Sequence, residues 1–194
     1  MGAERYEIVI VSAKAGRQTK REWNASELVK GVPWLKRMNA QGGDIYLRPL
    51  DGPELLLVDA LDAEAVKDLH RRGLAPAVTV ETNPGRFQAW VKVSDHPVPE
   101  KLRERVVAGL ARLLPTVCEY GCLAGFTNQQ AEPARGGRHP YVLAHDATGK
   151  AAAAAQKYLW TIELDLREET GEKQRLFSAE KARRVQPGGR GASR

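Results

Sequence analysis

The stretch AVTVETNPGRFQAWVKV, residues 77–93, decides the fold class of this chain. It holds two runs rich in β-branched and aromatic residues, 77–83 and 86–93, and such runs favour strands. Pro84-Gly85 lies between the runs, and this pair is typical of a tight turn. The pattern therefore predicts a β-hairpin.

Side chains of the second run divide between two faces, because successive residues of a strand point to opposite sides of the sheet. One face carries the apolar residues Phe87, Ala89, Val91 and Val93. The other face carries Gln88, Trp90 and Lys92. We expect the apolar face to pack in the core and the polar face to be exposed or half-exposed, where it suits a nucleic-acid strand. The alternative is an ordinary outer sheet face with one tryptophan beneath a helix.

Three more apolar runs predict strands. Residues 6–12 (YEIVIVS) alternate in polarity, and a basic turn over residues 14–21 is expected after them. Residues 44–50 (DIYLRPL) and 54–61 (ELLLVDAL) are separated by Asp51-Gly52-Pro53. Because this trio is a turn signature, the two runs are predicted to form a second hairpin.

A helix is predicted after the first strand. Asn24 and Glu27 have the spacing of a capping box, in which each side chain accepts a hydrogen bond from the other residue's backbone. Gly31 and Pro33 interrupt the apolar stripe that follows. We therefore expect two short helical pieces that end near Gly42.

The rest of the chain alternates helices with short extended segments. Asp62 is placed to cap a helix that stops at Gly73. Apolar spacing predicts an amphipathic helix over residues 99–114, and residues 141–146 (YVLAHD) favour a strand. We therefore predict an α/β (α+β) fold, in which helices pack on a mixed or antiparallel sheet.

Composition indicates one domain of ordinary size with a C-terminal extension. We place the domain at residues 1–149, a C-terminal helix at residues 150–178 and a basic tail at residues 179–194. The sequence holds neither a long apolar run nor a signal-peptide pattern, so we expect a cytoplasmic protein that does not contact membranes.

The net charge of +6 is concentrated in the tail, which has no acidic residue after Glu180. Because the tail is rich in glycine and poor in apolar residues, we predict that it is disordered. It either holds phosphates loosely or serves as a solubilising terminus.

Metal-ligand spacing is not found among the cysteines and histidines. Cys118 and Cys122 lack a second Cys or His pair nearby, so a free, reduced pair is expected rather than a zinc site. A structural or surface role is expected for His70, His96, His139 and His145.

Three stretches carry a resemblance to a known family. They are REWNASELVKGVPWLKRMNAQGGDIYLRP (21–49), LLLVDALD (55–62) with VETNPGRFQAWVKV (80–93), and GCLAGFTNQQ (121–130). In this order and spacing they resemble the RepB-type primase domain of plasmid replication and mobilisation proteins, a branch of the archaeo-eukaryotic primase superfamily. The resemblance implies an RRM-like catalytic sheet that makes short primers on single-stranded DNA, with Mg²⁺ or Mn²⁺ held by aspartates.

The chain departs from the family pattern where the chemistry is expected. Val58-Asp59-Ala60-Leu61 stands where the family has V-D-D-L, so Asp59 remains and its acidic neighbour is lost. Residues 116–119 (TVCE) replace a stretch with an aspartate and a histidine, Cys122 replaces an arginine, and Gln129-Gln130 replace a basic pair. Because two metal ions need several carboxylates, we expect nucleotidyl transfer to be weak or lost.

The resemblance assigns Asp59 as the residual catalytic and metal-binding residue. Mg²⁺ or Mn²⁺ is the expected cofactor if the site is catalytic, and none is expected otherwise. A single-stranded DNA or template-primer is expected to bind a face lined by Arg48, Gln88, Trp90, Lys92 and Asn128.

Two alternatives stay open beside this primase-like, DNA-binding protein of a plasmid or mobile element. One is an active primase with a rearranged acidic centre, in which Asp62, Glu64 or Glu119 replaces the lost ligand. The other is a non-catalytic module that binds replication or relaxase proteins of a mobile element. Trp23 and Trp34 are expected to be core anchors, or part of an interface if they are exposed.

Overall fold

The computed structural model describes residues 2–12, 17–51, 54–133 and 136–185. The elements of this part of the chain are β1 (Arg5–Ser12), β2 (Arg17–Asn24), α1 (Ala25–Ala40), β3 (Gly43–Pro49), β4 (Leu55–Leu61), α2 (Ala63–Arg71), β5 (Val78–Asn83), β6 (Arg86–Lys92), α3 (Glu100–Ala111), β7 (Val117–Cys118), β8 (Gly121–Cys122), β9 (Leu143–Asp146) and α4 (Ala153–Val185). Within these ranges, every helix is too short or too polar to cross a membrane.

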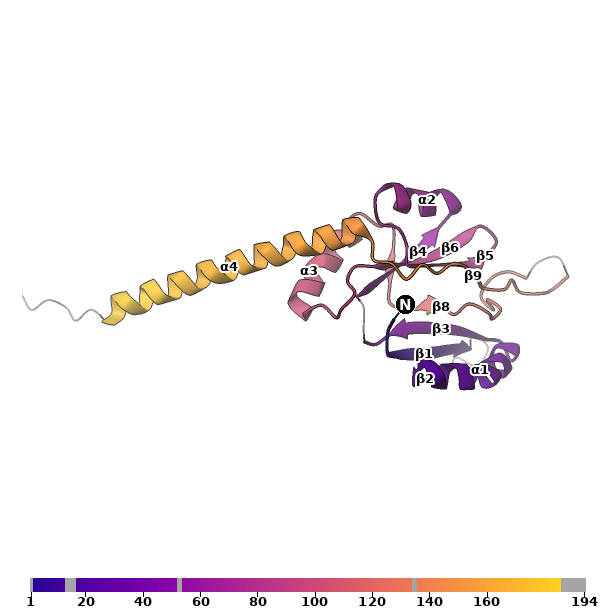
Figure 1. Cartoon of the computed structure of the whole chain (residues 1–194). Coiled ribbons are helices and arrows are strands. Elements are labelled where there is room, and N and C mark those ends of the chain that lie inside the picture. The colour runs from indigo at the N-terminus through magenta and orange to yellow at the C-terminus, as the bar shows by residue number, and fades with distance from the viewer. Residues whose placement is uncertain (1, 13–16, 52–53, 134–135, 186–194) are drawn as a thin grey trace, which may run out of the picture.

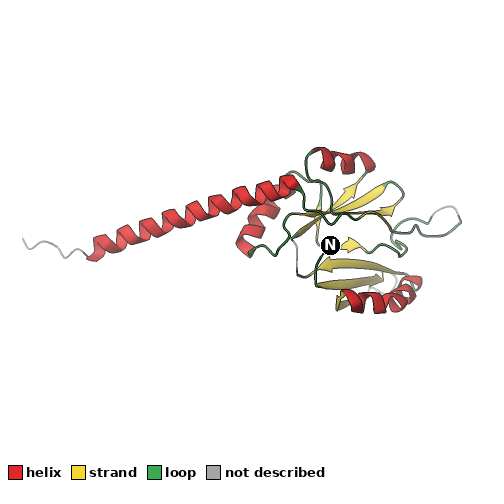
Figure 2. Cartoon of the chain, in the orientation of Figure 1, coloured by secondary structure: helices red, strands yellow, loops and turns green. Residues whose placement is uncertain are grey.

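The strands form two antiparallel sheets (Figure 2). Sheet A has the order β2-β1-β3-β8, and sheet B has the order β7-β4-β6-β5-β9. Helix α1 covers the outer face of sheet A and α2 covers the outer face of sheet B, so the inner faces of the two sheets lie toward each other (Figure 1). The predicted α+β class is confirmed, with two sheets in place of the single one expected.

Each sheet has its own apolar core on its outer side. Under α1, a cluster of side chains from β1 and β3 surrounds the fully buried Leu35. Trp23 and Trp34 pack against it with their rings edge to face, 5.7 Å between centroids, which confirms them as core anchors. A larger cluster joins the outer face of sheet B to α2, α3 and the first half of α4. The inner faces lie toward each other, and the cleft between them is lined at one end by Arg48, Leu57, Trp90, Cys118 and Glu119.

The hairpin predicted over residues 44–61 is wrong, although both of its strands exist. Strand β3 pairs with β1 and β8, while β4 pairs with β6 and β7, so the two strands lie in different sheets. Asp51 marks the crossover, since its carboxylate accepts hydrogen bonds from Arg5 and from the backbone N–H of Glu4. A turn signature does not specify that the flanking strands pair with each other. The turn residues 52–53 lie outside the described part.

The basic turn predicted after β1 is largely a strand. Residues 17–24 form β2, whose register with β1 runs from Ser12 opposite Arg17 to Arg5 opposite Asn24. Residues 14–16 of the predicted turn lie outside the described part. An edge strand tolerates alternating charged residues because one of its sides meets solvent.

Helix α1 is continuous, so the two short pieces predicted around Gly31 and Pro33 are wrong. Its start is as predicted: the Asn24 side chain accepts the Glu27 N–H at 2.9 Å, and the Glu27 carboxylate accepts the Asn24 N–H at 2.8 Å. Proline removes the hydrogen bond to the carbonyl of residue 29. Val29 is 71% exposed, so water can satisfy that carbonyl and the helix continues.

The other predicted elements are confirmed with shifted ends. Asp62 caps α2 by accepting the Ala65 N–H at 2.8 Å, and β5 and β6 form the hairpin predicted around Pro84-Gly85. Leu113 is 51% exposed because α3 has already ended at Ala111. Helix α4 includes residues 179–185, which were assigned to the tail, and extends away from the sheets (Figure 1). Residues 186–194 lie outside the described part.

Candidate functional site

The two sheets approach each other most closely where β8 meets β6. The Cys122 N–H donates to the Gln88 side chain at 2.8 Å, which ties sheet A to sheet B. A Cβ atom on Gly121 would lie 2.9 Å from Cζ2 of Trp90 and 3.2 Å from Leu57. Only glycine allows this spacing, because real Cβ atoms do not approach other carbons so closely.

The predicted exposure of Gln88, Trp90 and Lys92 is therefore wrong. These side chains are 5%, 4% and 8% exposed, because sheet A covers the face that carries them. The Lys92 ammonium also has two partners, the Asp95 carboxylate at 2.5 Å and the Gly149 carbonyl at 3.2 Å. Gln88 and Trp90 contact β8 and so hold the sheets together, whereas the Lys92 ammonium is held by Asp95 and Gly149 outside sheet A.

Asp59 lies half-buried on the inner face of β4, near the end of the strand. Its carboxylate accepts two hydrogen bonds, from the Ala60 N–H at 2.6 Å and from the Cys118 thiol at 3.8 Å. The chain turns here because Ala60 has a φ of +58° and the register with β6 shifts between Val58 and Leu61. The β-bulge aims the Asp59 side chain into the cleft.

Both cysteines border the Asp59 carboxylate and both are free thiols. Burial, followed by the charge of Asp59, raises the pKa of Cys118. Burial and the charges of Asp59 and Asp44 raise the pKa of Cys122 to about 12. Both sulfurs are therefore protonated at neutral pH, and a neutral thiol is a poor metal ligand. Burial also raises the pKa of Tyr46, which faces the same charges.

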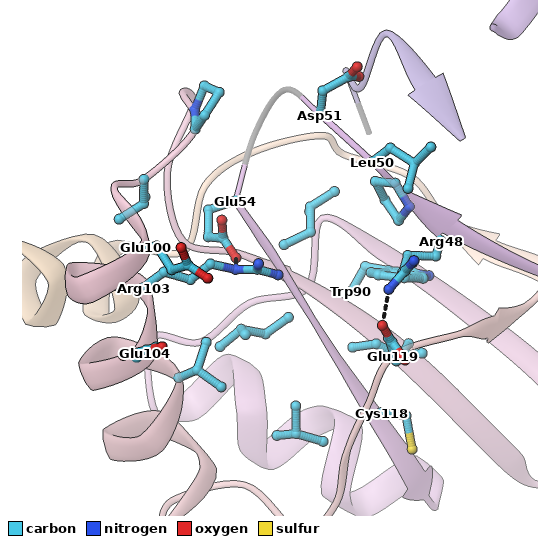
Figure 3. A pocket seen from close by; sticks show the side chains of 18 of the residues that line it. Arg48, Leu50, Asp51, Glu54, Trp90, Glu100, Arg103, Glu104, Cys118 and Glu119 are labelled. Carbon is cyan, nitrogen blue, oxygen red and sulfur yellow. Dashed lines mark hydrogen bonds and ion pairs between the residues drawn. The ribbon is translucent and has the colours of Figure 1, made fainter. Parts of the chain in front are cut away.

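A charged network lies at the mouth of the cleft, centred on the nearly buried Glu7 of β1. The carboxylate accepts from the Tyr120 hydroxyl and from the Arg48 guanidinium at 2.7 Å, and Lys20 lies 3.6 Å away. Arg48 also pairs with Glu119 (Figure 3) and stacks over the Tyr120 ring, 4.9 Å from its centroid. These partners lower the pKa of Glu7, the Tyr120 hydrogen bond first, so the group is charged at neutral pH.

One donor of this network lacks an acceptor. The Nε–H of Arg48 is buried without a hydrogen-bond partner among the described residues. Because an unpaired buried donor costs free energy, Arg48 is the least satisfied group of the network.

Asn128 lies at the other end of the cleft, in the loop after β8. Its side-chain oxygen accepts the N–H groups of Gln130 and Ala131, and its amide donates to the Thr82 carbonyl at 3.1 Å. The loop is held further by Asp44, which accepts the Gln129 N–H at 2.6 Å. Asn128 thus shapes the loop and is already hydrogen-bonded at both ends of its amide.

The three acids expected as replacement ligands are engaged elsewhere. Asp62 caps α2, Glu64 pairs with Arg71 at 2.8 Å, and Glu119 pairs with Arg48. No three His, Cys, Asp or Glu side chains of the described ranges are grouped so that they could hold a metal ion. A two-metal centre needs several hard oxygen ligands, whereas the hydrogen-bond partners of the Asp59 carboxylate among the described residues are the Ala60 N–H and the Cys118 thiol.

The structure places Arg48 and Asp59 on the inner sides of the two sheets and buries Gln88 and Trp90 between them, so the roles assigned to these residues from the sequence stay predictions. Sequence analysis missed Glu7, Lys20 and Tyr120. A signal for Glu7 existed, because it is a charged residue at an inward position of an otherwise apolar strand. Its partner Tyr120 could not be predicted, since it lies 113 residues away.

Two solved structures share this architecture. The crystal structure of primase RepB' matches with a TM-score of 0.77 and 34% identity, covering 95% of this chain and 65% of that chain. The catalytic domain of primase RepB' in complex with initiator DNA matches with a TM-score of 0.74 and 34% identity, covering 95% of this chain and 92% of that chain. The fold, together with the aspartate in its cleft, defines the chain as an α+β domain of the primase class.

The family follows from the sequence match. A family model, the RepB DNA-primase N-terminal domain, matches residues 5–169, and the chain belongs to this family. Mobilization protein A of Escherichia coli is 42% identical over 163 residues, which are 79% of this chain and 23% of that protein. A DNA primase of Acidithiobacillus ferrooxidans is 29% identical over 106 residues, 48% of this chain and 30% of that protein. The chain spans less than a third of the length of these curated relatives.

Proposed function

We propose that this chain is a DNA-binding primase-type domain of a plasmid or other mobile element, in which nucleotidyl transfer is weak or lost. It holds single-stranded DNA or a template-primer in the cleft between the two sheets. The proposal is supported by family membership, by the similarity to Mobilization protein A, and by the RepB' domain that was solved with initiator DNA.

The proposal that nucleotidyl transfer is weak or lost rests on the surroundings of Asp59. Ala60 and Cys118 flank its carboxylate, and neither side chain carries the hard oxygen that Mg²⁺ or Mn²⁺ prefers. Asp59 remains the only residue of the proposed catalytic site, and a lone carboxylate fixes a divalent ion poorly.

Strand binding is assigned to groups at the mouth and the floor of the cleft. Arg48 is the proposed phosphate contact, because its guanidinium side chain is 31% exposed and guanidinium groups bind phosphate oxygens strongly. Asn128 is proposed to position the loop that borders the strand. The buried residues beneath the cleft are proposed to keep it open at a defined width and not to stack on bases. These residues are Gln88, Trp90 and Lys92.

A primer-synthesis assay tests the catalytic half. Dinucleotide formation on a single-stranded template is measured with Mg²⁺ and with Mn²⁺, and we expect little or none from the wild-type chain. Ala60→Asp places a second carboxylate beside Asp59, and we expect it to raise Mn²⁺ binding and dinucleotide formation. Robust wild-type synthesis that Asp59→Ala abolishes would contradict the proposed impairment.

A binding assay tests the DNA half. Fluorescence anisotropy of a labelled single-stranded oligonucleotide should show binding that weakens with salt, because phosphate contacts release counterions. Arg48→Gln should weaken binding roughly uniformly across sequences, by about tenfold. The exposed Arg112, at the end of α3, supplies the matched control as Arg112→Gln. Equal loss in both variants, or no retention of DNA at low salt, is incompatible with a specific role for the cleft.

One observation favours an active enzyme with a rearranged acidic centre. Asp44 and Asp59 both raise the pKa of Cys122 and of Tyr46, so their charges reach the same part of the cleft. In that case Asp44→Asn should abolish metal-dependent synthesis as completely as Asp59→Ala. Under the proposed function, Asp44→Asn only loosens the loop that Asp44 holds at Gln129.

A further inference from the structure

A cavity adjoins the candidate site, between α3 and the start of β4, and shares Arg48, Trp90, Cys118 and Glu119 with it (Figure 3). Its volume is about 840 Å³, and its floor is apolar, with Leu55, Leu57, Trp90 and Val107 among the side chains that line it. A cavity of several hundred cubic ångströms has room for several side chains of a ligand. The proposed strand-binding function uses Arg48 and Trp90 of this lining but not its α3 side.

The rim of the cavity is acidic. Five carboxylates and two guanidinium groups lie around it: Asp51, Glu54, Glu100, Glu104 and Glu119, with Arg48 and Arg103. Both arginines are already paired, Arg103 with Glu54 at 2.7 Å and Arg48 with Glu119 and Glu7 (Figure 3). Glu100 and Glu104 are exposed on α3, and neither has an ion-pair partner among the described residues. The cavity therefore carries net negative charge.

This charge excludes one class of ligand and favours another. A nucleic-acid backbone or a nucleotide phosphate is repelled by Glu100 and Glu104 on the α3 side of the rim, so the proposed DNA strand is expected to reach the cavity only at Arg48. A small metal ion does not explain the apolar floor. A polypeptide segment with basic residues around one large apolar side chain satisfies both features, since charge complementarity steers it and apolar burial holds it.

We propose that this cavity is a docking site for such a basic, apolar-anchored segment of a partner protein. The large apolar side chain enters over Leu55, Leu57 and Val107, and the flanking lysines or arginines meet Glu100 and Glu104.

The test uses the whole chain and short labelled peptides, with fluorescence anisotropy at low salt as the readout. The probe peptide alternates lysine with leucine. Two control peptides replace every lysine by glutamate or every leucine by serine. We expect binding of the lysine–leucine peptide alone, with an affinity that falls as salt is added.

Two variants locate the binding to the cavity. Glu100→Gln combined with Glu104→Gln removes the two free rim charges and should weaken binding about tenfold. Ala108→Trp places an indole in the cavity from an exposed position on α3 and should also weaken binding about tenfold or more. Glu168→Gln combined with Glu172→Gln, on the exposed surface of α4, is the matched control and should leave the affinity unchanged.

The outcomes separate this proposal from the DNA-binding one. Single-stranded DNA binding should persist in both cavity variants, which also shows that they fold. The docking proposal is wrong if no basic peptide binds at low salt, if both control peptides bind equally well, or if neither cavity variant loses affinity. Displacement of the peptide by single-stranded DNA would instead make the cavity part of a nucleic-acid site.

Discussion

Ala60 holds an unusual backbone conformation for an alanine. Its φ of +58° lies in the left-handed region, which costs a residue with a Cβ atom about 1–2 kcal/mol. Aspartate and asparagine tolerate this region better than alanine does. The left-handed conformation of Ala60 forms part of the β-bulge that orients the Asp59 side chain.

Replacing Ala60 by glycine should stabilise the protein. Glycine adopts positive φ without strain, so Ala60→Gly is expected to raise the free energy of unfolding by about 1 kcal/mol. Ala60→Val should lower it, because β-branched residues fit this region worst. Urea denaturation of the three proteins measures both effects. A glycine variant less stable than the wild type would show that the left-handed turn is not populated in solution.

Glu7 should make stability depend on pH. Its pKa in the folded chain is lower than in the unfolded chain, where a glutamate has a pKa of about 4.3. The charged group therefore stabilises the fold above that pH, and this contribution is lost as the pH falls through the lowered folded pKa. Urea denaturation between neutral and acidic pH should show a shallower acidic decline for Glu7→Gln. The control is Glu22→Gln, on the exposed face of β2, which should follow the wild type.

At the scale of elements, α1 is shaped by a close contact with β2. A Cβ atom on Gly31 would lie 2.5 Å from Cζ3 of Trp23, so glycine is required where the helix crosses the indole. The apolar spacing and the capping box were sufficient to predict a helix, whereas its continuity through Pro33 depends on how the helix lies on sheet A. Gly31 therefore serves packing and does not interrupt the helix.

Two glycine substitutions in helices should have opposite effects. Replacing an exposed glycine in a helix by alanine raises the free energy of unfolding by about 1 kcal/mol. Gly171→Ala in α4 should follow this rule and raise the helix content measured by circular dichroism, because nothing lies within 4 Å of the added Cβ. Gly31→Ala should instead lower the free energy of unfolding by about 1–3 kcal/mol through overpacking. Stabilisation by both substitutions would contradict the packing of Trp23 on α1.

On the scale of the whole molecule, the width of the cleft is set by Gly121. The backbone of β8 rests on Trp90 at this position, and the adjacent Cys122 N–H is bonded to Gln88. The sheets cannot separate without breaking this contact. The cleft that presents Asp59 and Arg48 is therefore a property of how two sheets meet.

Gly121→Ala should disturb the contact between the two sheets. The added Cβ would lie 2.9 Å from the Trp90 ring, and relief of the contact should cost about 1–3 kcal/mol. We expect a lower melting temperature, a changed tryptophan fluorescence spectrum and weaker binding of single-stranded DNA. Cys122→Ser, which keeps the backbone N–H, is the control and should leave the spacing of the sheets intact. If Gly121→Ala is destabilised but binds single-stranded DNA as the wild type does, the spacing of the sheets is not needed for DNA binding.

Elements whose signals lie within a few residues could be predicted from the sequence. The Asn24–Glu27 capping box, the Asp62 cap and the Pro84-Gly85 hairpin all rest on contacts between chain neighbours, and each is found as predicted. Asp59 and Arg48 could be proposed as site residues because the surrounding motifs resemble a known family, and their roles stay predictions. Local propensity and a resemblance are enough for these features.

Tertiary structure alone decided the features that join distant parts of the chain. Four features depend on residues far apart in sequence. They are the assignment of β3 and β4 to different sheets, the burial of Trp90, the position of the Cys118 thiol beside Asp59 and the Tyr120–Glu7 hydrogen bond. Strand alternation divides side chains between two faces, but it does not say which face another sheet will cover. The burial of the polar face of β6 follows from the second sheet, whose position no local pattern encodes.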